Sequence, residues 1–261
     1  MARPARWTEK EVAPSIVEYK LSSWKYFSDF INQEMLDYTT YVYRGHGDSS
    51  WKLEPTLDRI IKAPISPRRA AHLERFKFET RGRRGANPAR MDSENDWWAL
   101  GQHHGLATPL LDWTESPFVA LFFAASSAST LKSKEYSVYA LSQASVARLN
   151  KDISGNDKAK LINNQKPTVK IVRPLSDENK RLVSQRGLFT RGPNNIDLEE
   201  WVRTHSKVDN ILDLIKITMP VAGVHECLRN LNRMNISHST LFPDLPGASE
   251  FCNSHLLINK Y

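Results

Sequence analysis

The sequence predicts a single domain in which helices and strands are mixed, of the α+β or α/β class. Apolar residues recur at helical spacing in some segments and alternate with polar residues, as in strands, in others. The two kinds of segment follow one another along all 261 residues. No internal repeat and no long linker rich in Gly, Ser or Pro divides the chain, so one domain is the simplest organisation.

Helices are predicted where capping residues precede apolar residues at helical spacing. The longest apolar run, Phe118 to Ala125, follows Ser116 and Pro117, which suit a helix cap and a first turn. Because the run is apolar on every side, this helix should be buried in the core. In chain order, helices are expected over residues 23–36, from 92 or 93 to about 105, and over 118–128, 176–184, 198–204, 220–234 and 245–257.

Strands are predicted where β-branched and aromatic residues cluster or where apolar residues alternate. Residues 40–44 fit the first pattern, and Gly45 ends this strand just after Arg44. Residues 211–219 fit the second pattern, since leucines and isoleucines point to opposite sides. In chain order, strands are expected over residues 40–44, 136–141, 168–172, 187–190 and 211–219, with an extended piece over 106–112.

Composition excludes several classes of protein. Hydrophobic residues make up 40% of the chain, enough to bury a core without disulfides. Cys227 and Cys252 fall in predicted helices without a C-x-x-C or Cys/His spacing, which argues against structural zinc and for a reducing compartment. No apolar run approaches the roughly 20 residues that span a bilayer, and no signal-peptide pattern follows the N-terminus. We therefore expect a cytoplasmic protein with no metal site and no membrane contact.

The net charge of +7 is concentrated in residues 68–90, which hold eight Lys or Arg against two Glu. Such a segment attracts phosphate-bearing ligands, although a solvated, partly flexible basic loop has the same composition. Residues 80–90 contain no aromatic side chain on which single-stranded bases would stack. The candidate nucleic-acid contacts are Arg68, Arg69, Arg81, Arg83 and Arg84.

Three short segments carry residues suited to chemistry. In the first, Arg44 ends a strand before Gly45, His46 and Gly47. A guanidinium there can grip a phosphate with two N–H groups while the glycines let the backbone approach a ligand. The same residues are also explained by an arginine that pairs with an internal carboxylate and by a tight turn.

The second segment, residues 102–117, places six polar side chains around the expected extended piece and the start of the buried helix. His103 and His104 are adjacent and point about 100° apart on a helix, which disfavours a shared metal. The helix start at Ser116 offers N–H groups and a positive dipole end to an anion such as a pyrophosphate. Alternatively, Ser116 and Thr114 only cap the helix, and Asp112 satisfies a neighbouring group.

The third segment joins a helix to a strand at Gln185 and Arg186. A glutamine can orient a ligand but cannot act as a base, and it is also a common turn residue. The chain contains no Gly-x-Gly-x-x-Gly loop, no Walker-type lysine loop, no Gly-x-Ser-x-Gly elbow and no His-Glu-x-x-His helix.

Taken in order, these segments resemble the FRG domain family, which is named for an (F/Y)-R-G motif. Residues 43–45 read YRG, residues 102–114 read QHHGLATPLLDWT beside the family's QHxGxPTRLLDWT, residues 185–189 read QRGLF, and residues 241–245 read LFPDL. The chain departs from the family at Ala107 and Pro109, where the family tends to have Pro and Arg. The likeness spans about residues 21–257, which implies an N-terminal extension over residues 1–20 and an FRG domain over 21–261.

A second, looser likeness is to ADP-ribosyltransferases of the arginine-serine-glutamate type. It implies an α+β fold with a central split or mixed β-sheet flanked by helices. Arg44 would hold the diphosphate or ribose oxygens of NAD, Gln185 would stand at the place of the catalytic Glu, and Asp112 would supply the missing carboxylate. The implied catalytic residues are Arg44, His104, Asp112, Thr114 and Gln185. The implied NAD-binding residues are Arg44, Gly45, His46, Gln102, His103 and Ser116.

These likenesses imply an enzyme that uses NAD as co-substrate, without a metal. It would transfer ADP-ribose to a protein or a nucleic acid, or hydrolyse NAD, as a toxin or a phage-defence effector. Two alternatives remain: a non-enzymatic nucleic-acid-binding or interaction module that uses residues 68–90, and a hydrolase that uses His103, His104 and Asp112. If the protein is an enzyme, Arg44, His104, Asp112 and Gln185 should meet in one cleft.

Overall fold

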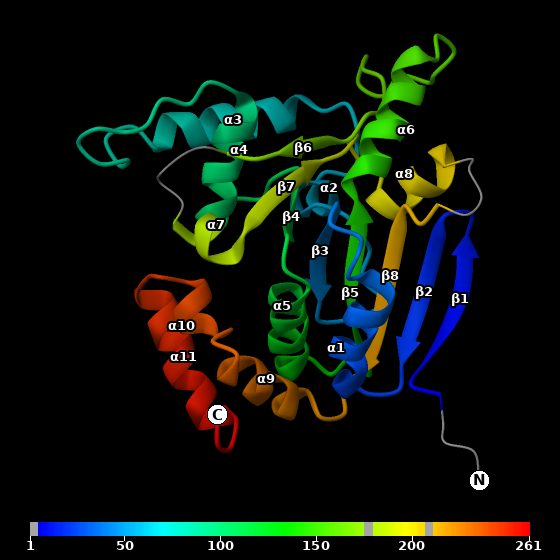
Figure 1. The fold of residues 1–261 in the computed structure, drawn as a ribbon. Helices are drawn as coiled ribbons and strands as arrows, with labels where there is room; N and C mark the ends of the chain where they lie inside the picture. The colour runs from blue at the N-terminus through cyan, green and yellow to red at the C-terminus, as the bar shows by residue number, and fades with distance from the viewer. Residues whose placement is uncertain (1–4, 175–179, 207–210) are drawn as a thin grey trace.

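A computed structural model describes residues 5–174, 180–206 and 211–261, and it contains one eight-stranded sheet with helices packed on both faces (Figure 1). The sheet order is β1-β2-β8-β5-β3-β4-β7-β6. The strands are β1 (Trp7–Ala13), β2 (Ile16–Leu21), β3 (Tyr41–His46), β4 (Leu110–Thr114), β5 (Glu135–Ser142), β6 (Lys170–Val172), β7 (Gly187–Arg191) and β8 (Leu214–Pro220). The β2–β8 pair is parallel and the others are antiparallel, so the sheet is mixed and the predicted α+β class is confirmed.

The pairing within the sheet is shortest between β3 and β4. The register there consists of the single pair Tyr43↔Thr114. In contrast, β3 pairs with β5 along its whole length, from Tyr41↔Ser142 to His46↔Ser137. Because β3 and β4 separate on either side of one residue pair, backbone groups at this point need partners other than a neighbouring strand.

Helices cover the two faces because alternate residues of each strand point to opposite sides. Val138 and Ala140 of β5 pack in the cluster that includes α5, α9 and the helical segment before β3, whereas Tyr139 and Leu141 pack in the cluster that includes α6 and α8. The helices are η1 (Trp24–Tyr26), α1 (Phe27–Phe30), η2 (Ile31–Met35), α2 (Thr56–Ile60), α3 (Pro67–Glu79), α4 (Glu94–His103), α5 (Pro117–Thr130), α6 (Gln143–Gly155), α7 (Lys180–Gln185), α8 (Leu198–His205), α9 (Val224–Arg233), α10 (His238–Leu241) and α11 (Leu245–Leu257).

Most elements expected from the sequence are present, and their ends follow the capping chemistry. Ser93 forms a capping box with Asp96 at the start of α4, and Gly105 adopts a φ of 82° just after its end. The Ser116 hydroxyl accepts from the Val119 N–H at the start of α5, which is buried as predicted. Of the helix expected over 176–184, residues 176–179 lie outside the described residues, and α7 begins at Lys180.

Several elements escaped sequence reasoning. Residues 7–21, expected to belong largely to an N-terminal extension, form β1 and β2 at one edge of the sheet (Figure 1). The first part of the basic segment, interpreted as a flexible loop, is the helix α3. Helices α2, α6 and α10 were also not predicted. In residues 5–174, 180–206 and 211–261, no helix combines the length and the apolar character that crossing a bilayer requires.

Candidate functional site

A pocket of about 300 Å³ lies where β3 and β4 separate. Its walls come from β3, α4, β4, α5, α7, β7 and the turn after α10, so segments far apart in sequence meet there. The lining residues are Tyr43, Arg44, Gly45, Gln102, His103, Asp112, Trp113, Thr114, Phe123, Arg181, Leu182, Gln185, Phe189 and Phe242. Arg44, Asp112 and Gln185 therefore line one pocket, whereas His104, the fourth residue expected to join them, is not among the lining residues.

The Arg44 side chain connects β3 to β4 beside their single residue pair. Its Nη1 donates to the Asp112 carbonyl at 2.7 Å and lies 3.4 Å from Asp112 Oδ2. Its Nε donates to His46 Nε2 at 3.1 Å. Among the described residues, Nη2 has no hydrogen-bond partner, so one side of the guanidinium remains available to a ligand.

Asp112 is the carboxylate of the pocket. Its Oδ2 accepts from Gln102 Nε2 at 2.8 Å, and Gln102 Oε1 in turn accepts from the Thr108 hydroxyl. This chain of contacts fixes the orientation of the Gln102 amide, because its oxygen and nitrogen have different partners. The Asp112 side chain is 58% exposed, so the held carboxylate can still be reached from solvent.

Thr114 and Gln185 join β4 to the segment around α10. The Thr114 hydroxyl donates to the Gln185 carbonyl at 2.6 Å, and Gln185 Nε2 donates to the Leu241 carbonyl at 3.0 Å. Both residues line the pocket, and through these contacts the Thr114 hydroxyl and Gln185 Nε2 hold its walls together. Among the described residues, Gln185 Oε1 has no hydrogen-bond partner.

Arg181 adds a second guanidinium to the pocket. Its Nε donates to Asp244 Oδ2 at 2.7 Å, and its guanidinium lies 5.1 Å from the centre of the Phe242 ring. The Gly247 N–H and Arg181 lower the pKa of Asp244, which keeps this carboxylate ionised. Phe242 also meets Phe123 of α5 edge to face, with ring centres 5.9 Å apart, so this wall is aromatic.

The glycines beside Arg44 have a packing role. A Cβ atom at Gly45 would lie 2.1 Å from the Ala120 carbonyl oxygen, and one at Gly47 would lie 2.2 Å from Ser127 Oγ. Both positions therefore need glycine because α5 crosses β3 at close range. The expectation that these glycines serve close approach to a ligand is corrected accordingly, although Gly45 does line the pocket.

Two further expectations change with the geometry. His46 is 4% exposed and is not among the pocket-lining residues, so it is a partner of Arg44 and not a ligand contact. At the start of α5, Ser116 N donates to Thr114 Oγ1 and Ser116 Oγ accepts from Val119 N. Because this helix end is capped by its own side chains and is not part of the pocket lining, it is not the anion site.

The two adjacent histidines differ in position. His103 lines the pocket, whereas His104 is exposed and is not a lining residue. Burial, His104 and Arg181 lower the pKa of His103, so its imidazole is neutral near pH 7. Of the two, His103 is the side chain that a ligand in the pocket would contact.

The comparisons with known proteins bear on this site. Residues 39–133, from the turn before β3 to just beyond the end of α5, match the family model of the FRG domain. The chain contains an FRG domain. No curated protein and no solved structure matches the chain. The matched residues of the FRG domain contribute Arg44, Gln102 and Asp112 to the pocket, and residues 181–189 and 242 complete it from outside the match.

The two departures from the FRG signature lie away from the pocket. The Ala107 carbonyl contacts His72 Nε2 at 3.0 Å. Pro109 lines a separate cavity of about 330 Å³ that also includes Trp98. Neither Ala107 nor Pro109 is among the residues that line the pocket around Arg44.

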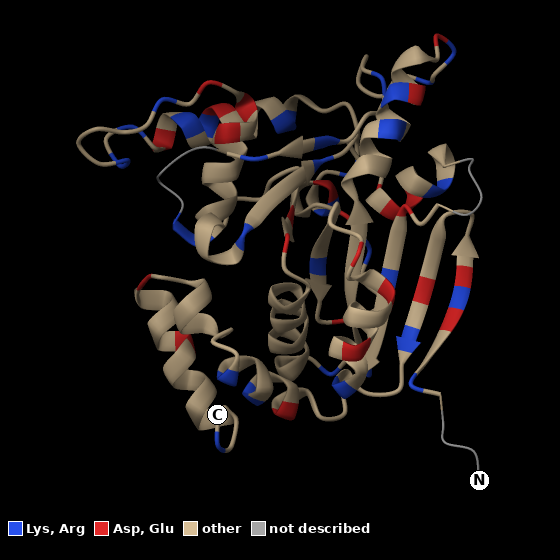
Figure 2. Cartoon of the chain, viewed as in Figure 1, with Lys and Arg blue, Asp and Glu red and all other residues tan. Residues whose placement is uncertain are grey.

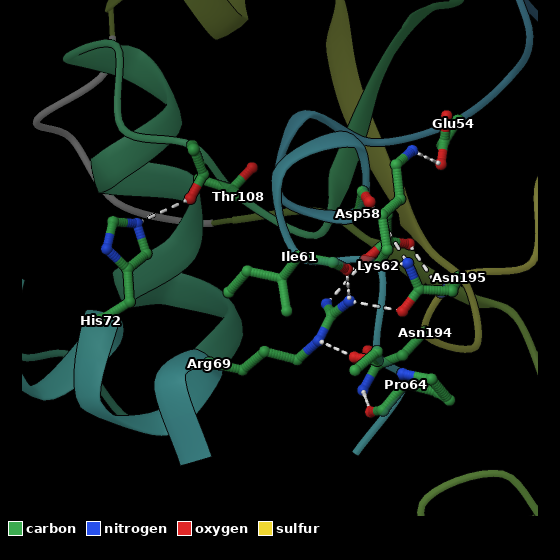
Figure 3. A network of polar contacts seen from close by, with 12 residues as sticks. Glu54, Asp58, Ile61, Lys62, Pro64, Arg69, His72, Thr108, Asn194 and Asn195 are labelled. Atoms are coloured by element: carbon green, nitrogen blue, oxygen red, sulfur yellow. Dashed lines mark hydrogen bonds and ion pairs between the residues drawn. The ribbon is translucent and has the colours of Figure 1, made fainter. Parts of the chain in front are cut away.

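The basic segment of the FRG domain does not form one cationic face. Arg69 is 8% exposed and donates to Asp58 Oδ1 at 2.6 Å, to Asn195 Oδ1 at 2.7 Å and to backbone carbonyls (Figure 3). The expectation that Arg69 contacts a nucleic acid is therefore wrong. Arg81 stacks on Phe78, and Arg83 lies 3.9 Å from Glu79.

Arg68 is exposed, Arg84 lies over the Trp97 ring, and Figure 2 shows acidic residues interspersed among the basic ones on α3. Seven residues that line the pocket were not among the site residues expected from the sequence: Tyr43, Trp113, Phe123, Arg181, Leu182, Phe189 and Phe242. Tyr43, Trp113 and Phe189 lie inside the quoted motifs, and the LFPDL motif contains Phe242 and the Asp244 partner of Arg181.

Proposed function

We propose that the FRG domain binds NAD in this pocket and cleaves it as an ADP-ribosyltransferase or an NAD glycohydrolase. The observation that carries the proposal is the meeting of Arg44, Asp112 and Gln185 in one pocket at the split of the sheet. These are the three positions at which the chain is similar to arginine-serine-glutamate transferases.

The chemical character of the pocket suits one half of a dinucleotide. Arg44 presents Nη2 to an anion, and the aromatic side chains of Phe123 and Phe242 offer faces for a heteroaromatic ring. A volume of about 300 Å³ is at the lower end of ligand pockets, which fits a ring with its ribose rather than a whole dinucleotide. The diphosphate would then extend from the pocket along Arg44.

The chemistry follows from the charges in the pocket. Breaking the bond between ribose C1′ and the nicotinamide nitrogen leaves neutral nicotinamide with the electron pair and a positive charge on the ribose. The Asp112 carboxylate would stabilise that charge, because Gln185 supplies none. Water or an acceptor group then attacks C1′ and loses a proton, which neutral His103, the imidazole among the lining residues, would accept.

Substitution of Asp112 tests this proposal. Asp112→Asn keeps the shape and the contact with Arg44 but removes the charge, so NAD should still bind while nicotinamide release falls by about 10²–10³-fold. Calorimetry with NAD measures binding, and mass spectrometry of nicotinamide and of ADP-ribose adducts measures turnover. Asp92→Asn is the matched control, because Asp92 is exposed and, among the described residues, Arg90 is its ion-pair partner. Absence of both NAD binding and any ADP-ribose product in the wild type would refute the proposal.

A role as a toxin or defence effector depends on the same chemistry. Cleavage of cellular NAD, or ADP-ribosylation of an essential protein or nucleic acid, would arrest growth of a host that produces the protein. Growth should stop on induction of the wild type and continue with Asp112→Asn at equal protein levels. Equal arrest by both forms would show that any toxicity does not come from this pocket.

A further inference from the structure

Arg44 can serve a ligand only if its guanidinium is held in one orientation, and His46 makes the contact that holds the Nε end. The two residues are two apart on β3 and therefore lie on the same side of the strand. Arg44 Nε donates to His46 Nε2 at 3.1 Å. Asp112 holds Nη1, so these two partners leave Nη2 as the open donor.

The His46 ring is itself fixed by packing. Its centre lies 5.2 Å from the ring of Tyr139 on β5 and 6.1 Å from the ring of Trp51, both at steep angles. The side chain is almost fully buried, so it has no room to change rotamer. An acceptor held this firmly on a strand can fix an arginine more closely than a surface residue can.

We propose that His46 is a positioning residue of the FRG pocket, which accepts the Arg44 Nε–H and so directs Nη2 toward the anionic part of a bound dinucleotide. The expected effect of His46 on NAD binding rests on the proposed function. The contact between His46 and Arg44 does not depend on it. An imidazole is suited to this task because it accepts through one nitrogen without adding a negative charge. A carboxylate in its place would compete with the ligand for the charge of Arg44.

The protonation state agrees with this role. Burial and the Arg44 guanidinium lower the pKa of His46 to about 3, and Lys216 and Arg59 act in the same direction. The ring is therefore neutral at physiological pH, with its proton on Nδ1 and its lone pair on Nε2 facing Arg44.

Nuclear magnetic resonance of the full chain tests the geometry without any ligand. With ¹⁵N-labelled protein, we expect a through-hydrogen-bond coupling between Arg44 Nε and His46 Nε2, and a His46 ring that does not titrate between pH 5 and 8. His46→Phe should abolish the coupling and expose the Arg44 Nε–H to fast exchange. Absence of the coupling in the wild type, or titration of His46 near pH 6.5, would overturn the inference even if NAD binds.

Binding measurements test the consequence. His46→Phe should weaken NAD binding about tenfold, because the guanidinium loses one of its two anchors. His46→Gln offers an amide oxygen to Arg44 Nε and should recover most of the affinity. His72→Gln is the matched control, since His72 contacts the Ala107 carbonyl outside the pocket and should leave affinity unchanged.

The two proposals fail in different ways. If the wild type does not bind NAD but the coupling is present, the proposed function fails and the orientation of Arg44 by His46 stands. If NAD binds and His46→Phe binds it as tightly as the wild type, with circular dichroism showing both forms folded, the positioning role is wrong.

Discussion

The sequence marks both Arg44, at the end of a strand, and Arg69, in the basic segment, as anion contacts, and burial separates their roles. Among the described residues, Arg44 Nη2 has no hydrogen-bond partner, whereas Arg69 donates to Asp58, Asn195 and backbone carbonyls. Asp58 is 2% exposed and also accepts from Asn195 N, so the pair forms a closed network beneath α3 (Figure 3). Such a network fixes α3 and the turn before it to the turn that follows β7.

Removing one member of this network should be costly. Arg69→Met leaves the Asp58 carboxylate buried without its cation, and we expect it to lower the free energy of unfolding by about 3–5 kcal/mol. Chemical denaturation monitored by circular dichroism measures the loss. Arg68→Met is the control at the neighbouring exposed position and should change stability by less than about 0.5 kcal/mol. Similar effects for the two variants would contradict the buried network.

His46 gives a stability effect that depends on pH. Its pKa is about 3 in the folded protein, below the ordinary value, so the unfolded chain takes up a proton at higher pH than the folded one. The resulting stabilisation is present above about pH 6.5 and is lost as pH falls toward 3. Between pH 6 and 4, the unfolding free energy of the wild type should fall by about 1.4 kcal/mol per pH unit more than that of His46→Gln. Parallel pH profiles would contradict this assignment.

At the level of elements, the close packing of α5 on β3 depends on glycines in and just after the strand. Gly45 and Gly47 allow the helix backbone to come within reach of the strand, and Ala120 and Ala124 complete the close approach. This approach brings Phe123 of α5 into the pocket beside Arg44. The glycine of the YRG motif is therefore a packing requirement that shapes the pocket, since a side chain there would lift the helix away.

Gly45→Ala should destabilise the protein and disturb the pocket. The added Cβ meets the Ala120 carbonyl, which is backbone and cannot turn aside, so the cost should be about 1–3 kcal/mol or more. Thermal unfolding followed by circular dichroism measures it. Gly155→Ala is the control: a Cβ there meets nothing within 4 Å, and alanine favours the end of α6. A neutral Gly45→Ala would show that α5 can shift without loss.

At the level of the whole molecule, the pocket depends on strand pairings that extend beyond the family match. Residues 39–133 include β3 and β4, which share the single pair Tyr43↔Thr114. The partners that hold these strands along their length are β5 for β3 and β7 for β4, and both follow residue 133. The matched segment thus contains most of the signature residues but not the sheet that supports them.

Residues 39–133 alone should not fold. Without β5 and β7, both strands become unpaired edges and the apolar α5 loses much of the surface it packs on. Far-UV circular dichroism of this fragment should lack a cooperative unfolding transition, whereas the full chain should show one. A cooperative transition in the fragment would show that the match delimits an independent domain.

Local sequence determined the elements with strong signals and the residues that carry the chemistry. Capping by Ser93 and Ser116, the apolar run of α5 and the alternation in β8 fixed those elements, because caps and periodicity act within a few residues. Three of the four motifs contain Arg44, Asp112 and Gln185, so the sequence alone pointed to these residues. Short or charged elements such as β1 and α3 were missed, because β1 is an exposed edge strand whose central residues are charged and α3 buries only Arg69 and Leu73, so neither shows a strong apolar pattern.

Only the tertiary structure decided what each marked residue does. In the folded chain Arg69 and His46 are buried, and His103 rather than His104 lines the pocket. At the start of α5, the side chains of Thr114 and Ser116 accept hydrogen bonds from backbone N–H groups. The tertiary structure also added Arg181 and Phe242 as a wall. Burial and free hydrogen-bond donors are properties of the packed chain, set by which strands adjoin and where they part. Residue type and spacing determine which interactions a side chain can make. Packing determines which of those interactions are formed within the protein and which are left for a ligand.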